Sequence, residues 1–211
     1  MKFKFWGVRG SIPSPGPKTN KYGGNTTCIE IRSADDDLII IDGGTGIYQL
    51  SQELLTKMPI DAHILITHTH WDHIHGLPFF SPIYIAGNAL TLYGGQDFVT
   101  GQGIDRTLKM QMQHSFFPIE EAALQADVSY KTVKAGEVFN IASARITPIL
   151  LNHPVINFGY RIDCDGSSLF FTGDYEQQLN IYQPDEAEYL PFQAMIDENV
   201  DALVELIKGV D

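Results

Sequence analysis

Short stretches of alternating or uniformly apolar residues recur along most of the chain and predict β-strands. The stretch 2–7 alternates Lys-Phe-Lys-Phe-Trp, which is typical of a strand with one buried face. The run AHILI at 62–66 is typical of a fully buried strand. The same two patterns predict the remaining strands, at 26–32, 38–42, 89–93, 128–133, 144–151, 157–163 and 168–172.

Helical periodicity is clearest near the end of the chain. The segment 186–208 carries one apolar face, formed by Phe192, Met195, Ile196, Val200, Leu203, Val204 and Ile207. A second helix is predicted at 46–57, with shorter helical pieces at 104–113 and 119–126. Strands and helices that alternate without an internal repeat or linker predict an α/β fold, with a single domain over residues 1–211.

Net charge narrows the range of partners. The 26 acidic residues outnumber the 14 basic ones and give a net charge of −12, and such a surface repels polyanions at long range. Because the sequence has no local basic patch, we expect no long nucleic acid partner. A small anionic substrate is compatible with this charge, since a bound metal can invert the local field.

Hydropathy and cysteine usage bear on the compartment. No run approaches about 18 apolar residues, so no membrane span is expected. The N-terminal MKFKFWG predicts an opening strand rather than a signal peptide. Cys28 and Cys164 could form at most one disulfide, and we expect instead two buried thiols in the reducing cytoplasm.

The stretch THTHWDHIHG contains four of the seven histidines and directly follows a predicted buried strand. Neutral imidazole and carboxylate are ligands that zinc and similar divalent ions prefer, so His68, His70, Asp72 and His73 are candidate metal ligands. Four ligands within six residues suit two ions, about 3.5–4 Å apart, better than one. A solvated polar loop is the alternative, but it does not explain such enrichment after a core strand.

Two further polar residues stand at the ends of predicted strands. His153 follows RITPILLN, and Asp174 follows SLFFTG. Either residue alone is more often solvated or capping than functional. Because strand ends that meet at one rim are where α/β domains place their sites, both are candidates to complete the shell around the histidine loop.

The run His68-Thr69-His70-Trp71-Asp72-His73, followed by His153 and then Thr172-Gly173-Asp174, resembles the motifs of the metallo-β-lactamase superfamily. Asp42, in the sequence IDGG, matches the first motif of that family. The resemblance runs from about residue 3 to 210. It implies an αββα sandwich with the metals at one edge of the paired sheets.

The resemblance also implies a division of the ligands between two metals. His68, His70 and His153 would hold the first metal. Asp72 and His73 would hold the second. Zinc is the expected ion at both sites, with manganese or iron as alternatives that suit the same nitrogen and oxygen ligands.

Three residues receive additional roles from the resemblance. Asp174 would bridge the two metals, and Asp42 would orient ligands through hydrogen bonds from behind them. His70 favours hydrolysis over redox chemistry, because the oxygen-reducing di-iron members of the family typically have glutamate at this place.

The opening segment 5–31 and the stretch GLPFFSP at 76–82 resemble the phosphodiesterase branch, which includes ribonuclease Z and the cyclic-phosphate phosphodiesterases of phosphonate breakdown. That branch implies a metal-dependent hydrolase that attacks a small cyclic or nucleotide-like phosphodiester through a metal-bound hydroxide. Asp72 would help orient the hydroxide. The loop 8–25 could bring backbone N–H groups and Asn25 to the substrate, or be purely structural.

The resemblance is incomplete in one respect. The family has a fifth motif with a further histidine, whereas this chain has none after His153. We therefore expect a domain whose C-terminal strand and helix portion is missing, through truncation, as a natural short form, or because a partner chain supplies it in a homodimer with strand exchange. The alternative functions are a metal-binding domain with lost or partner-dependent activity and a thioester or lactam hydrolase. His75 and His114 are expected at the surface.

Overall fold

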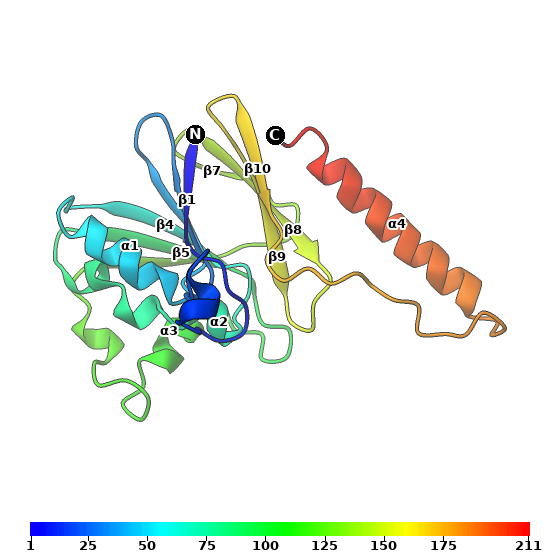
Figure 1. The fold of residues 1–211 in the computed structure, drawn as a ribbon, viewed down its shortest axis with the longest axis horizontal. Helices are drawn as coiled ribbons and strands as arrows, with labels where there is room; N and C mark the ends of the chain where they lie inside the picture. The colour runs from blue at the N-terminus through cyan, green and yellow to red at the C-terminus, as the bar shows by residue number, and fades with distance from the viewer.

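The computed structural model describes all 211 residues and consists of two β-sheets packed face to face, with helices outside them (Figure 1). The first sheet has six strands, of which the last four run parallel and the first two join antiparallel. Its strands, in order across the sheet, are β1 (Lys2–Gly7), β2 (Cys28–Arg32), β3 (Leu38–Ile41), β4 (Asp61–Leu65), β5 (Ala89–Gly94) and β6 (Asp127–Thr132).

The second sheet is antiparallel throughout, in the order β10-β9-β8-β7. Asp165 and Gly166 connect β9 to β10, and both have positive φ, which is what a two-residue hairpin turn requires at its centre. Its strands are β7 (Phe139–Ile141), β8 (Ala144–Leu151), β9 (Asn157–Cys164) and β10 (Ser167–Phe171).

Side-chain alternation along the parallel strands builds two separate cores. In β3, Ile39 and Ile41 point into the core between the sheets, whereas Leu38 and Ile40 point to the helices on the outer face. Each of these side chains is at most 2 % exposed, so each contributes about 1.5–3 kcal/mol through burial. This burial on both faces explains why β3 reads as a continuous apolar run.

Helices cover the outer face of the first sheet. The outer core contains side chains from α1 (Gly46–Leu54), α2 (Trp71–Ile74), a 3₁₀ turn at Ser81–Tyr84 and the neighbourhood of α3 (Asp105–Gln111). Further 3₁₀ turns lie at Pro17–Thr19, Leu77–Phe79 and Glu121–Ala123. No helix in the structure has the length and apolar character that a bilayer-spanning segment requires.

The last helix, α4 (Tyr189–Ile207), lies beyond the second sheet, at the opposite side of the molecule from α1 (Figure 1). Ile196 is its one buried side chain. The Arg161 guanidinium, on β9, donates to the carbonyls of Leu206 and Lys208 and ties the end of α4 to the sheet. The predicted helix and its apolar face are therefore present, but most of that face is not buried.

The predicted strands are all present, within two residues at each end, and the pattern missed only the three-residue β7. One predicted helix was wrong: 119–126 forms a single 3₁₀ turn at Glu121–Ala123. The backbone N–H groups of Gln125 and Ala126 donate to the carbonyl of Ile83 instead, so a tertiary contact takes the donors that a helix would use.

Candidate metal centre

The sequence-predicted ligands lie at the ends of strands from both sheets. Asp42 follows β3 and His68 lies three residues after β4, while His153 and Asp174 follow β8 and β10. The two sheets therefore present their strand ends at one rim, where the segment carrying α2 adds His70, Asp72 and His73. This convergence could not be measured from the sequence, because nothing local relates β4 to β8.

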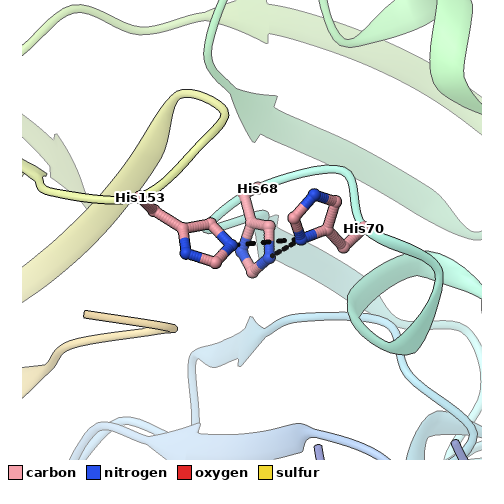
Figure 2. A group of neighbouring side chains, drawn as sticks. All are labelled: His68, His70 and His153. Carbon is pink, nitrogen blue, oxygen red and sulfur yellow. Dashed lines mark hydrogen bonds between the residues drawn. The ribbon is translucent and has the colours of Figure 1, made fainter. Parts of the chain in front are cut away.

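The imidazoles of His68, His70 and His153 point at one another, as Figure 2 shows. The Nδ1 atom of His70 lies 3.1 Å from Nε2 of His68 and 3.1 Å from Nε2 of His153. These three nitrogens belong to residues 85 positions apart at the extremes, yet all lie within 4.8 Å of one another. The structure thus brings together the three residues that the resemblance assigns to one metal.

Two outer nitrogens of this trio, those of His68 and His153, are fixed by other partners. Nδ1 of His68 lies 3.1 Å from Thr67 Oγ1, and Nδ1 of His153 lies 3.1 Å from a Glu176 carboxylate oxygen. A carboxylate only accepts, so His153 carries its proton on Nδ1 and leaves the Nε2 lone pair facing the centre. One proton on His70 can satisfy only one of its two neighbours. A divalent cation at the common point would satisfy all three nitrogens, so the donor set fits a metal.

The electrostatics of the trio favour the neutral, metal-binding form. Burial, together with the neighbouring charges of His73, His70 and His153, lowers the pKa of His68 to about 2. Burial also lowers the pKa of His70, with a further contribution from His153. The lone pairs of both residues are therefore free of protons at neutral pH.

A second group of donors lies beside the first. Nε2 of His73 is 3.3 Å from one carboxylate oxygen of Asp174 and 3.6 Å from Asp72 Oδ2. The other oxygen of Asp174 is 3.9 Å from Nε2 of His68, so Asp174 lies between the two groups. Nε2 of His73 is buried and has no hydrogen-bond partner. An orphaned buried nitrogen beside two carboxylates is what a second cation would satisfy.

Asp42 orients His73 from behind. Its fully buried carboxylate accepts from His73 Nδ1 at 2.7 Å and from the Thr67 backbone N–H at 2.8 Å. Burial raises the pKa of Asp42, and His73 and Thr67 offset part of that increase. Burial acts to lower the pKa of His73, but the carboxylates of Asp42, Asp174 and Asp72 together outweigh it and raise the pKa above the ordinary value. This contact holds Nε2 of His73 toward the centre.

Two glycines after Asp42 allow this arrangement. The Gly43 N–H donates to the carbonyl of His73 at 2.7 Å. A Cβ on Gly44 would lie 2.3 Å from the carbonyl oxygen of Asp72. Because no side chain fits there, the IDGG sequence lets the segment after β3 pack directly against α2.

The glycine-rich loop 8–25 reaches the centre through its backbone. The N–H of Ser11, a residue with φ of 67°, donates to Asp72 Oδ2 at 2.6 Å. Asn25 lies at the base of the loop, where its side-chain oxygen accepts from Thr45 Oγ1 and its carbonyl accepts from two backbone N–H groups. The structure therefore does not bring the Asn25 side chain together with the ligands.

The remaining histidines lie outside the two donor groups. His75 is exposed and packs edge-on against Trp71, with ring centroids 5.6 Å apart. His114 is exposed beyond the end of α3. Sequence reasoning missed Thr67 and Glu176, because only the fold brings a threonine and a glutamate against the outer nitrogens of the ligands.

A family model described as the β-lactamase superfamily domain matches residues 38–198, which is most of the chain. The chain belongs to the metallo-β-lactamase superfamily. The match covers all of the candidate ligands, from Asp42 to Asp174. The superfamily αββα arrangement accounts for the two face-to-face sheets with helices outside.

Curated superfamily relatives include ribonuclease BN of Erwinia tasmaniensis and ribonuclease Z of Lacticaseibacillus casei, each 28 % identical over 170 residues. Both matches cover 77 % of this chain, but 49 % and 47 % of the relatives. The chain thus spans about half the length of the curated relatives it matches. These relatives agree with the resemblance to the branch that includes ribonuclease Z.

Solved structures of the superfamily agree on the fold. The metallo-β-lactamase fold protein YhfI from Bacillus subtilis has a TM-score of 0.59 at 17 % identity, with 83 % of this chain and 63 % of that chain covered. Human tRNase Z, short form, has a TM-score of 0.55 at 20 % identity, with 82 % and 69 % covered. Yeast PDE1 has a TM-score of 0.56 at 19 % identity, with 94 % and 71 % covered.

Proposed function

We propose that this protein is a metal-dependent phosphodiesterase that hydrolyses a small cyclic or nucleotide-like phosphodiester. The observation that carries the proposal is the pair of donor groups at the rim of the sheets. His68, His70 and His153 form one group, and Asp174 lies between that group and His73. Two adjacent ions suit displacement at phosphorus, because each can stabilise one of the reacting oxygens.

The superfamily fold implies divalent metal ions, and the residues present fit them. The first ion would be held by the three histidine nitrogens, and the second by His73, Asp72 and Asp174. Zinc suits this mixture of imidazole and carboxylate, as do manganese and iron. When bound, such ions lower the pKa of water toward neutrality and offset negative charge on phosphate oxygens.

The chain itself supplies orientation and proton handling. Asp42 and Glu176 hold the rings of His73 and His153 with their inner nitrogens toward the centre. Asp72, whose Oδ2 accepts from the Ser11 N–H, keeps its carboxylate beside His73. In that position Asp72 would accept a hydrogen bond from the attacking water and align it with phosphorus.

The substrate class is argued from charge and from the relatives. A net charge of −12 without a basic patch works against a long polyanion, which supports a small phosphodiester. The names ribonuclease Z and ribonuclease BN favour RNA as the second candidate substrate. Both candidates require the same cleavage at phosphorus.

We assign the protein to the cytoplasm, because its two cysteines are free and buried.

Metal stoichiometry measured together with turnover tests the proposal. Protein loaded with zinc or manganese should bind two ions and hydrolyse bis(p-nitrophenyl) phosphate, and His68→Ala should abolish turnover. His114→Ala, a change of an exposed histidine away from the donors, is the matched control. Cleavage of a lactam or thioester without any phosphodiester would refute the phosphodiesterase. One ion or none, without turnover, would support a metal-binding domain instead. Cyclic nucleotides compared with a precursor tRNA then decide between the two substrate classes.

A further inference from the structure

A cavity of about 590 Å³ opens beside the metal centre, with His68 and Thr69 in its wall. It lies between α2, α3, the loop around 95–103 that follows β5 of the first sheet, and residues 154–156, which connect β8 to β9 of the second sheet (Figure 1 shows these elements). The volume falls in the range of sites for small organic ligands. Five aromatic side chains line it, namely Trp71, Phe79, Phe98, Phe116 and Phe117.

Three of these rings are largely exposed. Trp71 and Phe98 are each 67 % exposed, and Phe116 is 71 % exposed. Phe79 and Phe117 pack edge to face, with ring centroids 5.3 Å apart. Exposed rings gathered around one hollow cost solvation free energy, which a planar ligand stacked among them would recover.

One cation lines the cavity. The Nε of Arg106, on α3, donates to the sulfur of Met110 at 3.0 Å, and its two terminal nitrogens form no hydrogen bond or ion pair. Asp97, the other charged residue in the lining, uses Oδ1 to accept from Val99 and Thr100. Hydrogen bonds from Thr100 and, to a smaller extent, the Arg106 charge lower the pKa of the nearby Asp97 carboxyl, but the terminal N–H groups of Arg106 remain available to acceptor atoms of a ligand.

The cavity also offers uncommitted polar side chains. Gln102 and Thr107 line it, and neither side chain hydrogen-bonds to the protein. A purely apolar ligand, such as an alkyl chain, would leave them unpaired. A nucleobase would use both features, because its faces stack on aromatic rings while its edge carries donors and acceptors.

We propose that this cavity binds the nucleobase of a nucleotide-like ligand whose phosphate lies at the metal centre. The inference rests on the proposed function for the position of the phosphate, and it selects nucleotide esters over sugar cyclic phosphates that lack a base. Phe98 and Phe116 supply stacking surfaces. Arg106 supplies N–H donors for acceptor atoms on the base.

Binding of three phosphates to the metal-loaded protein tests this assignment by calorimetry. Adenosine 5′-monophosphate carries a base, ribose 5-phosphate lacks it, and octyl phosphate replaces it with an alkyl chain. The nucleotide should bind at least about tenfold more tightly than either of the others, which is within the range for base stacking. Phe98→Ala and Phe116→Ala should each remove most of that preference without changing ribose 5-phosphate binding, and Phe98→Tyr should keep it.

Phe3→Ala is the matched control, because Phe3 is 53 % exposed on β1 and does not line the cavity. Equal affinity for the nucleotide and ribose 5-phosphate would overturn the inference, as would octyl phosphate binding as tightly as the nucleotide. Equal effects of Phe3→Ala and Phe98→Ala would do the same. A base preference without phosphodiester turnover would leave the inference standing and refute the proposed function. Turnover without a base preference would refute the inference and leave the proposed function standing.

Discussion

The carboxylate of Asp42 lies 2.7 Å from Nδ1 of His73, and both side chains are at most 2 % exposed. The same carboxylate accepts from the backbone N–H of Thr67, the residue before His68. One buried acid therefore fixes the start of the histidine loop and the ring of a ligand six residues later. Because it contacts His73 directly and reaches His68 only through Thr67, its effect on metal binding should be larger at the donor group that contains His73.

Asp42→Asn keeps the size of the side chain and removes its charge. We expect the affinity for the second metal to fall about 10- to 100-fold, the usual effect of removing a partner that orients a ligand. The first metal should lose less affinity, because Asp42 reaches its ligand His68 only through Thr67 and does not contact His70 or His153. Competition with a chelator, titrated to separate the two ions, measures both constants. Asp35→Asn, at an exposed turn, is the control, and an equal loss at both sites would contradict the assignment of Asp42 to His73.

Glu176 makes the equivalent contact to His153, but its side chain is 63 % exposed, whereas Asp42 is fully buried. Solvent screening weakens an exposed contact, so Glu176→Gln should reduce affinity for the first metal by less than about tenfold. Chelator competition again gives the value, with Glu198→Gln as an exposed acidic control on α4. If Glu176→Gln weakened metal binding more than Asp42→Asn, burial would not be the property that ranks these two partners.

The ligands could be predicted from the sequence, but two of the partners that orient them could not. His68, His70 and Asp72 could be proposed as ligands because they are adjacent in the chain. His153 and Asp174 could be proposed because each ends an apolar run, and the fold brings both to the centre. Glu176 and Thr67 carry no local signal, since their roles depend on which ring nitrogen faces them after two sheets have packed. A contact with the distant 3₁₀ turn at Ser81–Tyr84 is likewise what replaced the helix predicted at 119–126.

The pH dependence of stability in the metal-free protein should reveal the neutral His68. Its pKa is about 2 in the folded protein and about 6.5 when unfolded, so between these values only the unfolded state binds the proton. The free energy of unfolding should therefore fall as pH decreases below about 6.5, by up to about 1.4 kcal/mol per pH unit from this group. Urea unfolding with a chelator present, from pH 7 to pH 5, measures the slope.

His73 should act in the opposite direction, because its pKa is raised in the folded state. Its contribution to stability is present below the pKa of the unfolded state and is lost as pH rises through the pKa of the folded state. His68→Asn should therefore make the decline toward pH 5 shallower than in the wild type, whereas His73→Asn should change the slope above about pH 6.5, between the unfolded-state and folded-state pKa of His73. His114→Asn should leave the slope unchanged. Parallel slopes for all four proteins would show that His68 takes up its proton in the folded state as easily as in the unfolded state.

Gly44→Ala tests whether the close approach of the IDGG segment to α2 builds the centre. The added Cβ would lie 2.3 Å from the Asp72 carbonyl oxygen, 2.5 Å from Thr26 Oγ1 and 2.6 Å from the Thr27 carbonyl oxygen. Two of these three atoms are backbone, so the conflict cannot be relieved by a side-chain rotation. We expect the free energy of unfolding to fall by about 1–3 kcal/mol, the usual cost of overpacking. Gly10→Ala is the matched control, because a Cβ there meets nothing within 4 Å. Displacing α2 moves His73 and Asp72, so at saturating metal the variant should bind fewer ions than the control even where it is folded. Urea unfolding gives the first quantity and metal analysis of the folded protein the second. A variant that loses stability but keeps both ions would show that the centre tolerates movement of α2, and that the glycine serves packing alone.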